Sequence, residues 1–139
     1  MRQRTFIMLK PETVARGFVG KIITRIEKTD LKIIAMKLIK ISPDQAEILY
    51  EIHKGKSFFS KLIGHITSGP VIVILVEGDE AVATIRKLCG KTNPLEAEEG
   101  SIRKLYGLNI TMNAIHAADS MENAQRESRI FFESNEIIE

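Results

Sequence analysis

Four short apolar runs along the chain predict four β-strands. These runs cover residues 5–9, 31–40, 71–76 and 113–117. The third run, VIVILV, is continuously apolar and rich in β-branched side chains, which is typical of a strand buried in the middle of a sheet. The first run ends at Lys10-Pro11, because proline lacks the backbone N–H that a continuing strand would donate.

Between these runs, the apolar positions recur at helical spacing. Residues 14–28 carry apolar side chains every three or four positions, which predicts one helix. Residues 42–45 (SPDQ) form a capping box with proline at the first helical position, which predicts the start of a second helix. Asp79 is expected to cap a further helix that ends at Gly90. Two more helices are expected over residues 58–66 and 120–132.

The order of the elements leaves two folds open. It is strand, helix, strand, helices, strand, helix, long loop, strand, helix. A parallel doubly wound sheet has this alternation. The split βαβ arrangement of the ferredoxin-like fold has it too, with an antiparallel sheet covered by helices on one face. The least regular stretch, residues 91–109, is longer than most connections, and such loops are usually functional or mobile.

Composition narrows the class of protein without naming a reaction. The 139 residues suit a single domain over residues 1–139, and 44% hydrophobic with 27% charged residues excludes a disordered chain. A net charge of +2 is too small to argue for nucleic-acid binding on charge alone. The single cysteine, Cys89, favours a reducing compartment. No apolar run approaches the ~20 residues of a membrane span, and the first residues do not resemble a signal peptide, so we expect a cytoplasmic protein.

The three histidines differ in their context. His53 and His65 fall in predicted helical stretches and suit surface or partly buried positions, without partners at metal-ligand spacing. His116 interrupts an apolar strand and precedes a turn into a helix. Such a histidine is more often a hydrogen-bonded core residue than a catalyst, although a neutral imidazole is a nucleophile at pH 7. The residues alone therefore indicate an α/β domain with one candidate histidine.

Residues 113–120, NAIHAADS, carry a more specific signal. They resemble the active-site signature of nucleoside diphosphate kinases, whose usual form is Asn-x-x-His-Gly-Ser-Asp-Ser. Other blocks, all earlier in the chain, also resemble this family and occur in the family's order: TFIMLKP, FF, SGPV, EG, GKTNP and GSIR. Because the blocks and their spacing agree over essentially the whole chain, the sequence is similar to a short, bacterial-type nucleoside diphosphate kinase.

The resemblance implies a fold, an activity and partners. The implied fold is α/β (α+β), a ferredoxin-like βαββαβ sandwich whose four-stranded antiparallel sheet is covered by helices. The implied activity transfers the γ-phosphate of a nucleoside triphosphate, mainly ATP, to a nucleoside diphosphate by a ping-pong mechanism through a phosphohistidine on His116. Mg²⁺ is the implied cofactor, held mainly by the nucleotide's phosphates. A homo-oligomer is expected, either a tetramer or a hexamer built from dimers, with no membrane or specific nucleic-acid partner.

The resemblance also assigns roles to particular residues. Glu127 is expected to orient the His116 ring from its Nδ1 side, and Tyr50 to position the phosphohistidine. Phe58 is expected to stack on the base. The positions expected to hold phosphates and ribose are Lys10, Arg86, Thr92, Arg103 and Asn113. Lys10 is also implied in catalysis, because a compact positive charge stabilises a phosphoryl group in transfer.

Three departures from the family's usual residues affect these expectations. Ala118 replaces a serine whose hydroxyl usually helps to hold Glu127. The loss of one such hydrogen bond is worth roughly 1 kcal/mol, so we expect a slower enzyme. Ala117 replaces a glycine, which restricts φ next to the nucleophile. Glu12 replaces the aspartate that commonly follows the Lys-Pro pair.

Two other functions stay open. The substitutions at positions 117 and 118 motivate a non-catalytic nucleotide-binding or regulatory module on the same fold. Such a module would have no need to keep both His116 and Glu127. A binder of single-stranded nucleic acid is opposed by the low aromatic content of 6% and by the absence of a run of aromatics suited to stacking on bases.

Overall fold

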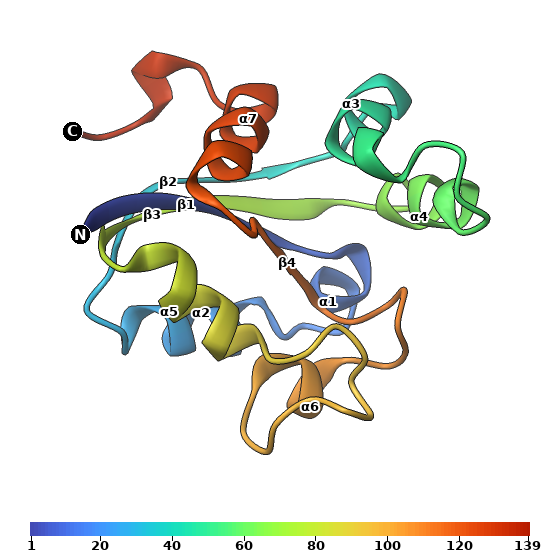
Figure 1. Ribbon diagram of the computed structural model, residues 1–139, viewed down its shortest axis with the longest axis horizontal. Coiled ribbons are helices and arrows are strands. Elements are labelled where there is room, and N and C mark those ends of the chain that lie inside the picture. Colours follow the sequence, from blue (N-terminus) through green and yellow to red (C-terminus); the bar gives the residue numbers. More distant parts are fainter.

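An antiparallel β-sheet forms the middle of the molecule (Figure 1). The computed structural model describes residues 1–139. The four strands are β1 (Arg2–Leu9), β2 (Lys32–Ile39), β3 (Val71–Asp79) and β4 (Ile115–Ala117). They lie in the order β2-β3-β1-β4, and all neighbouring pairs are antiparallel. This is the ferredoxin-like βαββαβ arrangement, and it excludes the parallel doubly wound alternative.

Seven α-helices connect and cover the strands. They are α1 (Pro11–Ala15), α2 (Val19–Glu27), α3 (Pro43–Leu49), α4 (Phe59–Ile66), α5 (Ala81–Cys89), α6 (Ile102–Tyr106) and α7 (Met121–Phe131). Two short 3₁₀ helices, η1 (Glu51–His53) and η2 (Ser134–Glu136), follow α3 and α7. None of the helices is both long and apolar enough to cross a membrane.

The single helix predicted over residues 14–28 is two helices. Gly17, between α1 and α2, has a φ of +75°, which glycine adopts without the steric cost that a Cβ would bring. The chain therefore breaks after α1 and begins a new helix at Val19. Periodicity does not reveal this break, because the apolar spacing continues across it.

Two further differences lie around α5. Asp79 is the last residue of β3 and does not cap the helix. The N-cap is Glu80, which has a φ of +48° and makes no side-chain cap. The long loop over residues 91–109 contains the short helix α6, whose first turn is capped by the Ser101 hydroxyl, which accepts a hydrogen bond from the Lys104 N–H. Serine is a favoured N-cap residue, so this cap agrees with the sequence of the loop.

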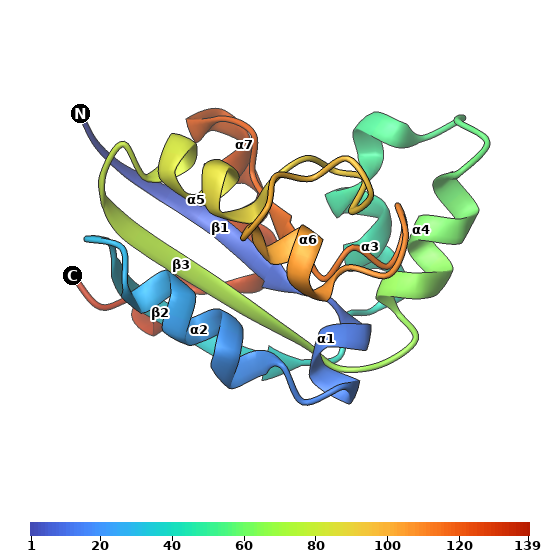
Figure 2. The same cartoon turned by 90° about the horizontal axis from the view of Figure 1, so that it is seen from below.

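Helices cover both faces of the sheet, not one face as predicted (Figures 1 and 2). α3 and α7 lie over one face, and α2 and α5 cross β1 and β3 on the other. Alternate residues of β3 pack into two separate apolar clusters, one with Phe131 of α7 and the other with Ile85 of α5. A strand buried on both faces requires the continuous apolar run that residues 71–76 provide.

The pairing of β4 with β1 brings two candidate residues to one end of the sheet. His116 of β4 lies opposite Met8 of β1. Lys10 follows β1 directly, and its backbone N–H donates to the carbonyl of Ala114 over 3.0 Å. The sheet register therefore sets where Lys10 and His116 lie relative to each other.

Candidate active site

A cavity of about 450 Å³ lies around His116 and Lys10. Its volume suits a small-molecule ligand. The residues to which the family resemblance assigned a role all line it: Lys10, Tyr50, Phe58, Arg86, Thr92, Arg103, Asn113, His116 and Glu127. They come from elements far apart in the sequence, including β4, α5, α6 and α7. The fold therefore gathers cationic, hydroxyl, amide and aromatic side chains around one histidine.

The His116 ring is held through one of its two nitrogens. Its Nε2 atom lies 2.8 Å from Oε1 of Glu127, a buried residue of α7. An ionised carboxylate accepts the proton of Nε2–H, which favours the tautomer that has a lone pair on Nδ1. The expectation that Glu127 acts from the Nδ1 side is wrong, because α7 packs against β1 and presents the carboxylate to Nε2. Nδ1 is therefore the ring nitrogen without a hydrogen-bond partner in the chain.

Glu127 keeps this position without a serine at residue 118. Its second oxygen lies 3.7 Å from the guanidinium of Arg126. That guanidinium donates to the carbonyls of Ile48 and Leu49 at the end of α3, over 2.9 and 3.3 Å. Ala118 is buried in the apolar cluster beneath α7. Contacts from α3 and α7 therefore orient the Glu127 carboxylate, although this chain lacks the serine hydroxyl that usually helps to hold it in the family.

The unusual backbone near the nucleophile is not at Ala117. Ala117 lies in β4 and has no positive φ, so the alanine that replaces the family's glycine is not strained there. Ala114 instead has a φ of +78°, in the left-handed region that residues with a Cβ rarely adopt. Ala114 is fully buried and lies two residues before His116.

Lys10 places a buried ammonium group at the cavity. Lys10 is only 5% exposed, and its Nζ donates to the carbonyl of Thr111 over 3.1 Å. Burial lowers the pKa of Lys10 from 10.5 to about 8; the Glu12 carboxylate opposes this shift, and the Arg103 guanidinium adds to it. Lys10 is therefore a cation at neutral pH that loses its proton in mildly alkaline solution.

Arg103 and Asn113 each keep one buried polar atom without a partner. The two terminal nitrogens of Arg103 donate to the carbonyls of Gly90 and Ile115, over 2.9 and 2.8 Å, while its Nε is buried and unbonded. The amide nitrogen of Asn113 donates to the carbonyl of Thr92 over 3.0 Å, and its Oδ1 is buried and unbonded. Buried polar atoms are rarely left unpaired. Both residues line the cavity, so a ligand bound there lies beside two polar groups that the chain leaves unpaired.

Two aromatic residues on the α3–α4 side line the same cavity. Phe58 immediately precedes α4 and is 42% exposed, so one apolar ring is accessible to a flat ligand. Tyr50 is buried, and its ring is perpendicular to that of His116 with 6.2 Å between centroids. Burial raises the pKa of Tyr50 well above its ordinary value, so its hydroxyl stays protonated at neutral pH.

The structure adds one charged residue to the predicted set. Asp119 lines the cavity, and its Oδ1 accepts a hydrogen bond of 2.6 Å from the amide of Asn123. This hydrogen bond lowers the pKa of Asp119, so the residue is an anion at neutral pH. Asp119 lies in the NAIHAADS block, three residues after His116, and this short separation in the sequence is the signal that could have identified it.

Comparison with known proteins shows the same similarity along the whole chain. The family model described as "Nucleoside diphosphate kinase" matches residues 3–137. A nucleoside diphosphate kinase of Saccharolobus solfataricus is 52% identical and the match covers 97% of this chain and 98% of that protein. One of Listeria monocytogenes is also 52% identical, over 98% of this chain and 92% of that protein.

Solved structures agree with this similarity. The nucleoside diphosphate kinase of Aquifex aeolicus has a TM-score of 0.97 and 35% identity, covering 99% of this chain and 100% of that one. The halophilic enzyme of Halobacterium salinarum, solved in complex with CDP, has a TM-score of 0.96 and 38% identity. That match covers 100% of this chain and 93% of the other.

Proposed function

Because this chain belongs to the nucleoside diphosphate kinase family, we propose that His116 carries the phosphoryl group between its two nucleotides. The enzyme transfers the γ-phosphate of a nucleoside triphosphate, mainly ATP, to a nucleoside diphosphate through a phosphohistidine. The 2.8 Å contact between Glu127 and Nε2 is the observation that supports His116 in this role. It leaves the lone pair of Nδ1 free to attack phosphorus.

The reaction consists of two displacements at phosphorus. In the first, Nδ1 forms a bond to the γ-phosphorus as the bond to the β–γ bridging oxygen breaks, and the nucleoside diphosphate leaves. In the second, a terminal β-phosphate oxygen of the acceptor forms the new P–O bond and the N–P bond breaks. The positive charge that the ring gains on phosphorylation is balanced by Glu127 through Nε2–H, since the two lie in hydrogen-bond contact.

The cationic residues suit stabilisation of the transferred group. Phosphoryl transfer depends mainly on positioning and on charge stabilisation at the oxygens around phosphorus. Arg86, which makes no ion pair within the chain, and Arg103 offer forked donors to phosphate oxygens. Lys10 offers a compact charge in the same cavity as His116. The hydroxyl of Thr92 is a further donor to a phosphate, and that of Tyr50 is a donor to the phosphohistidine.

The remaining residues suit the nucleoside. Asn113 Oδ1, buried without a partner, is an acceptor for a ribose hydroxyl. The exposed ring of Phe58 is a surface on which any base can stack, because every base has a π-face. Stacking carries little information about the identity of the base. The enzyme is therefore proposed to accept nucleotides with different bases.

A divalent metal is general in nucleotide kinases, and Mg²⁺ is the ion proposed here. No cluster of three or more histidine, cysteine or acidic side chains provides a ready-made metal site, and Asp119 and Glu127 are the two carboxylates that line the cavity. This donor set fits a magnesium ion that takes most of its oxygen ligands from the nucleotide's phosphates. When bound, the ion neutralises part of the triphosphate's charge.

We also propose that the chain forms a homo-oligomer, a tetramer or hexamer built from dimers, in the cytoplasm. β2 is an edge strand, and Met36 and Leu38 on it are 49% and 60% exposed. A long edge strand with exposed apolar side chains is a template for pairing with another chain. Pairing of two β2 strands would cover these side chains and give the dimer from which a larger assembly is built.

The experiment for His116 is phosphorylation of the chain by γ-labelled ATP. We expect an acid-labile, base-stable label that is transferred to added nucleoside diphosphate and is absent from the His116→Ala chain. His53 also lines the cavity, so His53→Ala is the matched control and should keep the label. A nucleotide-binding module without activity would protect the fold with nucleotide but never become labelled. That result would reject the proposal.

A further inference from the structure

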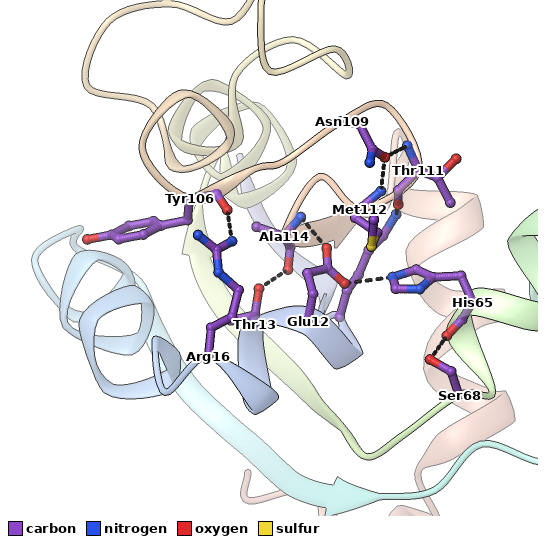
Figure 3. Close-up of polar contacts among 11 residues, drawn as sticks. Glu12, Thr13, Arg16, His65, Ser68, Tyr106, Asn109, Thr111, Met112 and Ala114 are labelled. Atoms are coloured by element: carbon purple, nitrogen blue, oxygen red, sulfur yellow. Dashed lines mark hydrogen bonds and ion pairs between the residues drawn. The ribbon is translucent and has the colours of Figure 1, made fainter.

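A buried carboxylate outside the cavity connects three parts of the site (Figure 3). Glu12, in α1, is 8% exposed and does not line the cavity. Its Oε2 accepts the N–H of Ala114 over 2.8 Å, and its Oε1 lies 2.6 Å from Nε2 of His65 on α4. One side chain therefore joins α1 to the segment before β4 and to α4.

The first of these contacts fixes the backbone ahead of the nucleophile. Ala114, at φ +78°, adopts a conformation that is unfavourable for a residue with a Cβ. Its N–H donates to Glu12, and its carbonyl accepts from the hydroxyl of Thr13 over 2.8 Å and from the N–H of Lys10 over 3.0 Å. Both polar groups of the Ala114 backbone are thus held by residues 10–13. Because Ala114 lies between Asn113 and His116, this bonding orients the backbone that carries both.

The second contact reaches the segment proposed to bind the base. His65 lies in the last turn of α4, and Phe58 immediately precedes the first turn of that helix. The carbonyl of His65 accepts a hydrogen bond of 2.6 Å from the hydroxyl of Ser68, which ties the end of the helix (Figure 3). The Glu12–His65 contact therefore connects the helix beside Phe58 with the strand that carries His116.

The charge of Glu12 also acts on Lys10. Burial lowers the pKa of Lys10, Glu12 raises it, and Arg103 lowers it. Burial opposes ionisation of Glu12 itself, but its hydrogen bonds from His65 and Ala114 outweigh this, so the pKa of Glu12 is below its ordinary value. The charged or titratable groups involved are Lys10 after β1, His65 of α4, Arg103 of α6 and Tyr50 after α3. Glu12 is the anion among them that favours a protonated Lys10.

We propose that Glu12 is a positioning residue for phosphoryl transfer, which holds Ala114 ahead of His116 and is anchored by His65. This inference rests on the proposed role of His116. It is a property of this chain's own residues, because the family commonly has an aspartate where this chain has Glu12. In this chain the two oxygens of the Glu12 carboxylate contact Ala114 and His65, one each.

The test measures the single-turnover rate of His116 phosphorylation by γ-labelled ATP from pH 6 to 10. For Glu12→Gln we expect a rate about tenfold to a hundredfold lower, as for other small displacements of a reacting group. We also expect the alkaline fall in rate to begin at lower pH, because Lys10 loses its supporting anion. Glu12→Asp keeps the charge, so its alkaline fall should stay near that of the unchanged chain. Glu27→Gln removes an exposed charge from α2 and is the matched control, which should alter neither quantity.

A second variant covers the case in which Glu12→Gln does not fold, which circular dichroism would show. His65→Phe removes the ring nitrogen that contacts Glu12 and keeps an aromatic ring, and a folded His65→Phe chain should also be phosphorylated more slowly. The inference is overturned if folded Glu12→Gln shows the same rate and the same alkaline fall as the unchanged chain. If Glu12→Gln does not fold, the same result for His65→Phe overturns it. In either case, labelling of the unchanged chain still supports His116. An unchanged chain that is never labelled would instead overturn the proposed function, and this inference with it.

Discussion

Oε1 of Glu127 lies 2.8 Å from Nε2 of His116, and nothing in the chain bonds to Nδ1. This relationship decides which nitrogen is available to phosphorus. It also shows how a carboxylate on α7 and a histidine on β4, eleven positions apart in the sequence, act as one unit.

Removal of the Glu127 charge should slow phosphorylation of His116. In Glu127→Gln the ring loses the anion that stabilises its positive charge, and the amide no longer selects one tautomer. We expect a rate at least about tenfold to a hundredfold lower, the effect of removing a carboxylate that orients a metal-bound histidine. Single-turnover labelling measures it. Glu122→Gln, an exposed change on the same helix, should have no effect, and an equal rate in both variants would contradict the role of Glu127.

The rate should fall as pH rises through about 8. The pKa of Lys10 is lowered to about 8 in the folded chain, so above that pH the free enzyme loses a positive charge that faces the transferred phosphate. The quantity to measure is kcat/KM, which reports the free enzyme, between pH 6 and 10. A Lys10→Arg chain, whose guanidinium does not titrate in this range, should lose the alkaline fall even if its rate is lower. A flat profile for the unchanged chain would show that Lys10 is not required as a cation.

Loss of the Phe58 ring should weaken binding of all nucleotides to a similar extent. A base–aromatic stack is worth roughly 1–3 kcal/mol, so Phe58→Ala is expected to raise Kd about tenfold to a hundredfold. Calorimetric titration with ADP, GDP, CDP and UDP measures this. Phe58→Tyr keeps the ring and should bind normally. A loss confined to one base would mean that Phe58 reads base identity and does not simply stack.

Restoring the family's usual serine should speed the reaction. A hydroxyl at position 118 would add a hydrogen bond near Glu127, worth roughly 1 kcal/mol, and we expect Ala118→Ser to raise the labelling rate about fivefold. Ala117→Gly is the matched comparison. It should bring no gain, because Ala117 already has an unstrained φ in β4. A slower Ala118→Ser chain would show that the buried site cannot satisfy the added hydroxyl.

A charge on the exposed edge of β2 should dissociate the assembly. Leu38 is 60% exposed in the single chain, and Leu38→Glu would place a carboxylate in the proposed contact between two β2 strands. Light scattering should show a smaller mass for Leu38→Glu than for the unchanged chain. Lys28→Glu, an exposed change just after α2, is the control. An unchanged mass would place the interface elsewhere.

Much of the sheet was predictable because its signal is local. The continuous run over residues 71–76 predicted a strand buried in the middle of the sheet, and β3 lies between β2 and β1. The strand direction and the helices on both faces were not predictable from periodicity, since pairing depends on contacts between distant residues. The break at Gly17 is not predictable from periodicity, because a left-handed residue does not disturb the apolar spacing.

The chemistry of the site was predictable to a different degree. The apolar pattern identifies His116, because it interrupts a strand, but it identifies no partner for this histidine. The other cavity residues are predicted only by the family resemblance. The structure brings those residues together around one cavity, but the nitrogen that Glu127 contacts is set by how α7 packs, which no motif records. The role of Glu12 is not predictable from the sequence, because its contacts with Ala114 and His65 join residues that are far apart in the chain.

The unbonded Nε of Arg103 and Oδ1 of Asn113 have a consequence for the lifetime of the protein. Each buried polar atom without a partner costs stability, roughly 1–3 kcal/mol, and an occupied cavity removes that cost. The nucleotide-free chain is therefore the form most easily opened and degraded by proteases.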